Sequence, residues 1–294
     1  SIAKVFDMTV ASTGLAAKRL KQFGIPYASS TTHSASHAGY YPDALPLTLK
    51  LTFDPASGKL YGGQCVGYDG ADKRIDQIAL LIKQGGTVYD LIKVEHAYAP
   101  PFSSAKDPIA IAGYVAGNII SGAMPVATWR QMAEADRCDT LFLDVRTREE
   151  HAFGAIPGSV NIPLDELRGR IGELPRDKEI YIYCAVGLRG YLALKILTGH
   201  GFSRVKNLSG GYKTYATATA PIENKTATIR TNGKTDTQHT GERIKTLKID
   251  ACGLQCPGPV MKIKQAIDSI GEGERIEMVA TDAGFSRDAQ AWCN

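Results

Sequence analysis

Cys184 lies at a corner of the sequence where chemistry is expected. It ends the apolar run YIY and is followed by the loop AVGLRG and a helical pattern. We expect residues 185–189 to form the loop and the helix to run from Tyr191 onward. Loop N–H groups, the helix N-terminus and the charge of Arg189 would then stabilise a thiolate or a persulfide anion. A buried structural cysteine at a strand end is the alternative.

Cys256 is the second candidate thiol. Pro257-Gly258-Pro259 and an apolar-periodic run follow it, and proline suits the first turn of a helix. Cys256 is therefore expected near a helix N-terminus, where an anion is again stabilised. An incidental capping cysteine is the alternative. Cys252 could pair with it in a metal site, but no nearby residues complete four ligands, so no metal is predicted.

Composition limits the class of protein that presents these thiols. A chain of 294 residues predicts two or three domains, and 44% hydrophobic with 22% charged residues is typical of a globular protein. The net charge of +4 and the scattered basic residues argue against nucleic acid binding. No apolar run suits a membrane span, and the N-terminus does not resemble a signal peptide. Six sparse cysteines favour reduced thiols in a cytoplasmic protein.

Hydrophobic periodicity divides the chain into segments. Residues 1–105 predict an α+β domain with an antiparallel sheet, and residues 106–124 a connector helix. Residues 125–215 alternate strands and helices, which predicts an α/β domain with a parallel sheet. Residues 216–245 are rich in Thr, Asn, Gly and Lys and predict a flexible linker. Residues 246–294 resume with a strand, a helix and a strand.

The segment 125–215 resembles a single rhodanese domain. The resemblance is carried by LDVRTREEHAFGAIPGSVNIPL, CAVGLRG and NLSGGYKTY. It implies that Cys184 is the sulfur-carrying nucleophile and that Arg189 and the loop amides cradle the transferred group; the substrate-binding residues are then Ala185, Val186, Gly187, Leu188 and Gly190. Asp144 and Arg146 match a pair that supports the site, or they form only a structural ion pair.

The length of the Cys184 loop separates two chemistries. Related cysteine phosphatases of the same fold carry one more residue between the cysteine and the arginine. The spacing here is C-x-x-x-x-R, which favours transfer of a small sulfur over hydrolysis of a bulkier phosphate ester.

Residues 247–294 resemble the small TusA/SirA-like sulfur carriers. The run from Asp250 to Pro259 and the string TDAGFSRDAQAWC carry the match, which implies that Cys256 carries a persulfide. The match covers about the first two-thirds of such a domain, so a truncated α/β-sandwich over 246–294 is expected. Cys252 is expected to be a half-buried small side chain.

Residues 1–105 resemble the dimerisation domain of FAD-dependent pyridine nucleotide–disulfide oxidoreductases, closest to the coenzyme A-disulfide and persulfide reductases. The strings SIAKVFDMTVASTGL, SHAGYYPDALPLTLKL, VGYDGADKRIDQIALLI and HAYAPPFSSAKDP carry it. The resemblance implies a homodimer in which Tyr40 and Tyr98 reach the partner subunit's active site. The alternative is that both aromatics only pack at the dimer interface.

The resemblance implies FAD and NAD(P)H as cofactors of the parent enzyme and CoA as substrate or ligand. The sequence has no G-x-G-x-x-G turn in a suitable context, so the flavin-binding domain is absent from it. We expect the chain to be a piece of a longer protein, because it starts without Met and stops directly after the pattern DAQAWC.

The sequence thus predicts a sulfur-handling part of a flavin-dependent CoA-disulfide or persulfide reductase. Cys184 would take sulfane sulfur from a donor as a persulfide and pass it to CoA, to the flavin site or to Cys256. A non-catalytic dimeric scaffold or thiol redox sensor is the main alternative, and a phosphatase is a third.

Overall fold

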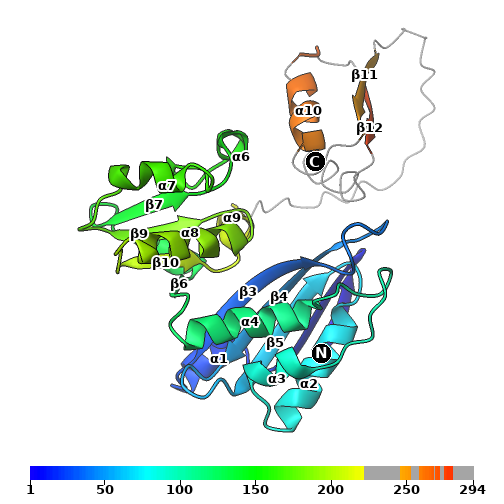
Figure 1. Cartoon of the computed structure of the whole chain (residues 1–294). Coiled ribbons are helices and arrows are strands. Elements are labelled where there is room, and N and C mark those ends of the chain that lie inside the picture. The colour runs from blue at the N-terminus through cyan, green and yellow to red at the C-terminus, as the bar shows by residue number, and fades with distance from the viewer. Residues whose placement is uncertain (222–245, 253–257, 268, 272–274, 281–294) are drawn as a thin grey trace, which may run out of the picture. The chain divides into compact units, whose positions relative to one another are not determined.

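The structure is a computed structural model that describes residues 1–221, 246–252, 258–267, 269–271 and 275–280. The chain divides into two compact units, Ser1–Ala218 and Thr219–Asn294. The first unit holds two sheets of five strands, and the described residues of the second form a pair of strands (Figure 1). None of the helices among the described residues has the length and apolarity to cross a membrane.

The first domain is built on an antiparallel sheet, as the sequence predicts, in the strand order β1-β2-β5-β4-β3. Its strands are β1 (Ile2–Val5), β2 (Met8–Gly14), β3 (Ala28–Ala35), β4 (Pro46–Phe53) and β5 (Leu60–Gly67). Its helices are α1 (Ala17–Gln22), α2 (Ala71–Lys83) and α3 (Val88–Lys93).

The two faces of this sheet differ in polarity. Alternate residues of β4, Leu47, Leu49 and Leu51, point into the core, where Ile75 and Ile78 of α2 meet them. Helices α2, α3 and α4 (Pro108–Ile120) lie over this face (Figure 1). The residues between them on β4 belong to the opposite, polar face, because side chains alternate along a strand.

Helix α4 lies within the range 106–124 that was expected to be a connector, and it packs in the core of the first domain. Its Ile109 and Ala112 are fully buried in that core, whereas Ile119 also contacts the core of the second domain. The Asp107 carboxylate caps α4 by accepting a hydrogen bond from the Ile109 N–H, and Pro108 occupies the first turn. The helix therefore fixes the start of the second domain against the first.

The second domain has the parallel sheet that alternating strands and helices predict, in the order β6-β10-β9-β7-β8. Its strands are β6 (Val126–Ala127), β7 (Thr140–Asp144), β8 (Val160–Asn161), β9 (Glu179–Tyr183) and β10 (Val205–Leu208). Its helices are α5 (Trp129–Glu134), α6 (Arg148–Phe153), α7 (Leu167–Arg170), a 3-10 turn (Ile171–Glu173), α8 (Leu188–Gly199) and α9 (Gly211–Thr219).

Both faces of the parallel sheet are buried. Ile180 and Ile182 of β9 join one apolar cluster with helix α8, and Tyr181 and Tyr183 join the cluster on the other side. Burial on both faces explains why β9 reads as an unbroken apolar run in the sequence. Because β9 pairs in parallel with its neighbours, its end, and with it Cys184, lies at the carboxyl edge of the sheet.

In the second unit, β11 (Thr246–Ala251) pairs in parallel with β12 (Arg275–Ala280), and α10 (Gly258–Ile267) contacts both strands. The predicted order of strand, helix and strand is thus present. Cys256 lies outside the described residues, as does most of the predicted linker. Helix α9 extends through Thr219, four residues into the range where the linker was predicted.

Candidate functional site

Cys184 follows directly after β9 and is 1% exposed. The Gly187 N–H donates a hydrogen bond to its Sγ over 3.1 Å. The side chains of Val186 in the loop and of Leu188 just after it are exposed, whereas Cys184 is buried. A backbone N–H directed at the sulfur is the contact that favours a thiolate or a persulfide anion.

Helix α8 begins earlier than the sequence predicts. It runs from Leu188, so Leu188, Arg189 and Gly190 form its first turn and are not part of an extended loop. The cause is Gly187, whose φ of 119° turns the chain directly into the helix. The early start places the helix N-terminus, with its free N–H groups, immediately after the thiol.

The segment after β10 forms backbone hydrogen bonds with the cysteine loop. The Tyr212 N–H donates to the Cys184 carbonyl over 2.8 Å, and the Lys213 N–H donates to the Ala185 carbonyl over 3.0 Å. Gly211 makes this approach possible, because a Cβ there would stand 2.5 Å from the Cys184 carbonyl oxygen. The start of α9 therefore determines the position of the loop.

Asn207 holds the loop from a second side. Its Nδ2 donates to the Gly187 carbonyl over 3.0 Å. A Cβ on Gly190 would come within 2.2 Å of the Asn207 Oδ1, so the glycine lets helix α8 approach this side chain. Asn207 is buried, and it was not among the residues singled out in the sequence.

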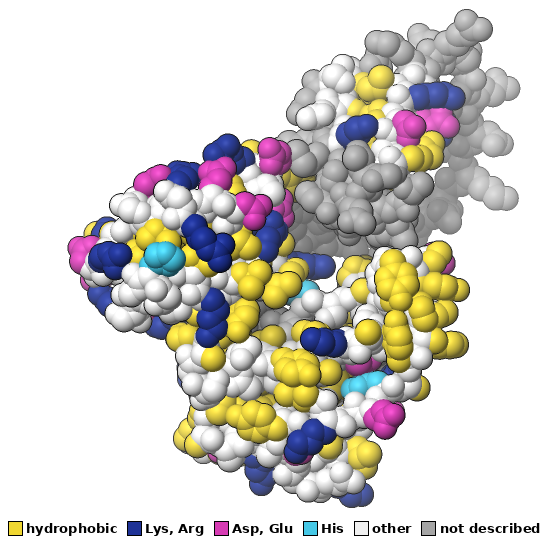
Figure 2. Space-filling view, viewed as in Figure 1, with side chains coloured by type: hydrophobic (Ala, Val, Ile, Leu, Met, Phe, Trp, Pro, Cys, Tyr) yellow, Lys and Arg dark blue, Asp and Glu magenta, His cyan; other side chains and the backbone are white. Residues whose placement is uncertain are grey.

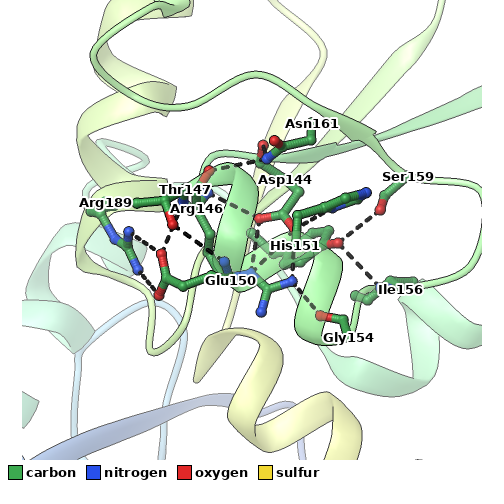
Figure 3. Close-up of polar contacts among 11 residues, drawn as sticks. Asp144, Arg146, Thr147, Glu150, His151, Gly154, Ile156, Ser159, Asn161 and Arg189 are labelled. Atoms are coloured by element: carbon green, nitrogen blue, oxygen red, sulfur yellow. Dashed lines mark hydrogen bonds and ion pairs between the residues drawn. The ribbon is translucent and has the colours of Figure 1, made fainter. Parts of the chain in front are cut away.

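Arg189 is engaged by a carboxylate that the sequence analysis did not identify. Both terminal guanidinium nitrogens donate to the two carboxylate oxygens of Glu150, each over 2.7 Å (Figure 3). Burial acts to raise the pKa of Glu150, but the hydrogen bonds from Arg189 and the Thr147 N–H hold it below its usual value. The cation of the loop is thus paired in this structure.

Asp144 and Arg146 form a buried pair. The Arg146 Nη2 donates to Asp144 Oδ2 over 2.7 Å, and the His151 Nδ1 lies 2.9 Å from the same oxygen (Figure 3). Although burial acts to raise the pKa of Asp144, these contacts hold it below the usual range. Arg146 also donates to the Gly154 carbonyl over 2.8 Å, so the pair ties the end of β7 to the end of α6.

The two tyrosines predicted to reach the partner subunit's active site are adjacent in the first domain. The Tyr40 and Tyr98 hydroxyls lie 3.0 Å apart, and both side chains are exposed. The contact with Tyr40 raises the pKa of Tyr98. Tyr40, Tyr41, Tyr98 and Phe102 are among the exposed large hydrophobic residues of the first domain. Figure 2 shows that hydrophobic side chains gather at one end of this domain.

A buried ion pair anchors the segments that carry these tyrosines. The Arg74 Nη2 donates to Asp107 Oδ2 and to the Ser36 carbonyl, each over 2.8 Å. The Asp107 Oδ2 also accepts from the Ser103 hydroxyl, 2.7 Å away. Ser36 lies close to Tyr40 in the chain, and Ser103 lies close to Tyr98. The Arg74–Asp107 pair therefore links the two segments that carry these tyrosines.

Cys252 and Cys65 lie outside the Cys184 loop. Cys252 is exposed, contrary to the half-buried position expected, and its N–H donates to the Asp250 carboxylate over 2.8 Å. That carboxylate raises the pKa of the Cys252 thiol. Cys65 is buried in the first core, which raises its pKa to about 12. No group of metal-ligating side chains occurs within the described ranges.

Three domain families match successive parts of the chain. Residues 1–108 match the pyridine nucleotide-disulphide oxidoreductase dimerisation domain, residues 126–218 the rhodanese-like domain, and residues 247–294 the sulfurtransferase TusA. The chain therefore combines a dimerisation domain of this oxidoreductase class with a rhodanese-like and a TusA-like domain.

Two solved structures resemble the chain over most of its length. The reduced CoADR-RHD of Bacillus anthracis is 50% identical, with a TM-score of 0.72 over 74% of this chain and 39% of that one. The NAD-dependent persulfide reductase of A. fulgidus is 39% identical, with a TM-score of 0.64 over 72% of this chain and 38% of that one.

Curated relatives match a shorter part. The coenzyme A disulfide reductase of Staphylococcus epidermidis is 44% identical over 116 residues, which is 40% of this chain and 26% of that protein. The enzyme of Staphylococcus aureus is 40% identical over the same length. The chain thus spans about a quarter of these relatives and about two-fifths of the solved structures.

Proposed function

We propose that the chain is a sulfurtransferase module in which Cys184 accepts a sulfane sulfur and passes it on as a persulfide. One observation carries the proposal: the buried Sγ accepts a hydrogen bond from the Gly187 N–H at the start of α8. The rhodanese-like match and the relatives that reduce CoA disulfide or persulfide support it. The donor class is a persulfide or another sulfane-sulfur compound.

The transfer step balances without an outside oxidant. The Cys184 thiolate attacks the terminal sulfur of a donor R–S–SH, a new S–S bond forms on Cys184, and the donor S–S bond breaks. The donor leaves as its thiolate R–S⁻, while the enzyme carries Cys184–S–SH. An acceptor thiolate then attacks the outer sulfur and releases the Cys184 thiolate. We propose the CoA thiol and Cys256 as acceptors.

The residues around the thiol suit a small transferred group better than a phosphate. The sulfur is almost fully buried, and the loop around it has four residues between Cys184 and Arg189. Glu150 also neutralises Arg189, and a phosphate dianion would require that positive charge. These features favour sulfur transfer over phosphate ester hydrolysis.

The proposed role of Asp144 and Arg146 is to support the loop. Arg146 lies 4.2 Å from the centre of the Tyr212 ring, and the Tyr212 backbone holds the Cys184 carbonyl. The pair therefore reaches the nucleophile through α9. Arg189, together with Gly187 and the rest of the loop, would bind the donor.

We further propose that the chain forms a homodimer in the cytoplasm through its first domain. Tyr40 and Tyr98 would then hydrogen-bond to a sulfur at the partner subunit's active site. The described residues do not fit FAD, because Gly62 and Gly63 lie inside β5 and Gly85 ends a helix, so neither pair forms a dinucleotide turn. FAD and NAD(P)H would therefore belong to another domain of the parent enzyme.

The test compares two cysteines of the same domain. Cys184→Ser should abolish sulfur transfer from thiosulfate or a polysulfide to a thiol, and mass spectrometry should find no added sulfur on that peptide. Cys138→Ser is the matched control, because Cys138 is an exposed free cysteine outside the loop. Sulfur transfer by Cys184→Ser above about a tenth of the wild-type rate contradicts the proposal, because a nucleophile contributes far more than that.

The same assay distinguishes a sulfurtransferase from the alternative, a thiol redox sensor. A sensor thiol would form disulfides with an oxidant but would not turn over a sulfane donor. Repeated turnover by the wild-type chain, lost in Cys184→Ser and kept in Cys138→Ser, is the expected result for the transferase.

A further inference from the structure

A cavity of about 620 Å³ lies between the first domain and the rhodanese-like domain, both within the unit Ser1–Ala218. It is separate from the Cys184 loop and from the tyrosine pair. Its walls come from α1, β3, β4 and β5 on one side and from α5 and the start of α9 on the other. Its volume is within the range of small-molecule sites.

The floor of the cavity is the polar face of the antiparallel sheet. Thr31, Lys50 and Gln64 are paired side by side across β3, β4 and β5. They alternate with the buried leucines of β4, so the three side chains share the face opposite the apolar core. A row of a hydroxyl, an ammonium and an amide offers hydrogen bonds to a polar ligand.

Direct hydrogen bonds hold the two walls in place. The Thr31 N–H donates to the Ser209 hydroxyl over 3.0 Å, and His33 Nε2 lies 2.8 Å from the Thr214 hydroxyl. These contacts join β3 to the end of β10 and to α9. The two walls of the cavity are therefore linked directly by hydrogen bonds.

The lining carries four cationic side chains and no carboxylate among the described residues: Lys18, Lys21, Lys50 and Arg130. Lys50 is half-buried, and its side-chain ammonium forms no hydrogen bond or ion pair with a described residue. Burial and the nearby charge of Arg130 lower its pKa. Concentrated positive charge without a counter-ion favours a ligand with several negative charges.

Aromatic side chains stand beside this charge. Trp129 and Tyr27 line the same cavity, and the Arg130 guanidinium lies 5.1 Å from the centre of the Trp129 ring. We propose that the cavity binds a phosphorylated nucleotide, with its phosphates toward the lysines and Arg130 and its base toward Trp129 and Tyr27. The sheet-face hydroxyls and Gln64 would bond to the sugar or the base.

A simple phosphate ion fits the cavity less well. One phosphate would leave most of the 620 Å³ unfilled and would not contact both the lysines and the aromatic rings. A nucleoside without phosphate would leave the cations uncompensated. The combination of charge, rings and volume is what selects a nucleotide with at least two phosphate charges.

The test uses the whole 294-residue chain and ADP as the probe. Trp292→Phe leaves Trp129 as the single tryptophan, because the sequence has two, so its fluorescence reports occupation of the cavity. ADP should change this fluorescence saturably and should bind about tenfold more tightly than adenosine or pyrophosphate alone. Calorimetry on the unmodified chain gives an independent affinity.

Two variants and a matched control locate the binding. Lys50→Gln and Arg130→Gln should each weaken ADP binding about tenfold, because each removes a charge directed at the phosphates. Lys83→Gln removes the same charge at the exposed end of α2, a helix on the opposite face of the sheet, and should leave the affinity unchanged. Circular dichroism confirms that the variants are folded.

The proposal is overturned if ADP does not bind at about millimolar concentration, the weak end of specific affinities. It is also overturned if adenosine or pyrophosphate binds as tightly as ADP. If Lys50→Gln and Lys83→Gln weaken ADP binding equally, the proposal is also overturned, because ADP would then be attracted by the overall charge of the protein and not by the cavity.

Discussion

Glu150 and Arg189 are joined by two hydrogen bonds of 2.7 Å between the helix that follows β7 and the first turn of the helix that follows Cys184. Glu150 also caps its own helix, since it accepts a hydrogen bond from the Thr147 N–H over 2.9 Å. One carboxylate therefore caps the start of α6 and neutralises the cation of Arg189, five residues after Cys184. If Arg189 binds the donor, as proposed, this pairing should influence which donor charge the loop accepts.

Glu150→Gln should make the loop favour anionic donors. Glutamine keeps the cap, because an amide oxygen also accepts the Thr147 N–H, but it no longer neutralises Arg189. We expect the KM for thiosulfate to fall about fivefold, since the interaction of two partly buried charges is worth on the order of 1 kcal/mol. Steady-state kinetics at constant ionic strength measures this.

Glu149→Gln is the matched control for this change. Glu149 is the neighbouring glutamate, it is exposed, and it forms no ion pair with Arg189. An equal fall in KM for both variants would show that general surface charge, and not the Glu150–Arg189 pair, determines the donor preference.

Gly211→Ala should disable the transfer by displacing the cysteine loop. Gly211 has a φ of 60°, and an added Cβ would stand 2.5 Å from the Cys184 carbonyl. We expect the sulfur transfer rate to fall at least about tenfold, because an error of about 1 Å in geometry has effects of this size. The rate with a saturating donor is the measurement.

Gly199→Ala provides the comparison. It lies in helix α8 of the same domain, and a Cβ there meets nothing within 4 Å. Its activity should match the wild type. If Gly211→Ala is equally active, the contact between α9 and the loop does not position the nucleophile.

The sequence predicts those parts of the site that are local in the chain. The strand, the cysteine, the glycines and the arginine lie within residues 179–190, and the parallel sheet follows from the alternation of strands and helices. The Thr147-x-x-Glu150 spacing is a capping signal, but nothing in it indicates Arg189, which lies 39 residues away. Partners that far apart in the chain are set by tertiary packing.

The contacts that hold the Cys184 loop in place could not be predicted from the sequence either, because they also depend on tertiary packing. Asn207 and Gly211 lie in the string NLSGGYKTY, which carries part of the rhodanese resemblance, but the string does not indicate which residues of the Cys184 loop this segment contacts. The start of α8 was misplaced because the glycine before it turns the chain into the helix without the extended loop that was expected. Roles assigned to individual site residues stay predictions.

His33 should make the stability of the first unit depend on pH. It lies between Thr48 and Thr214, and burial together with the charge of Lys213 lowers its pKa to about 4. The unfolded chain binds this proton near pH 6.5 and the folded chain only near pH 4. The free energy of unfolding therefore falls as the pH drops from about 6.5 to 4, by at most about 3 kcal/mol.

His33→Gln should remove this slope. Urea unfolding of both proteins between about pH 7 and 4 gives the difference in the free energy of unfolding, in which the other histidines and the carboxylates cancel. We expect the difference to change steadily across that range. A constant difference would show that His33 does not stay uncharged in the folded protein.

Sulfur on Cys184 should move to Cys256 within one molecule. The sequence predicts a flexible linker over 216–245, which as a coil would reach roughly 30 Å and hold the two thiols at millimolar effective concentration. Loading the chain with a sulfane donor should therefore place sulfur on Cys256 at a rate that does not depend on protein concentration. Peptide mass spectrometry follows the added sulfur on each cysteine.

Cleavage near Gly233 is the decisive comparison for this transfer. It leaves both thiols intact but turns an intramolecular encounter into an intermolecular one, so transfer should become second-order and slower at micromolar concentration. Cys184→Ser should leave Cys256 unloaded, because the donor sulfur then has no entry point. Loading of Cys256 in that variant, or an unchanged rate after cleavage, would show that each thiol reacts with the donor independently and that the two domains do not form a relay.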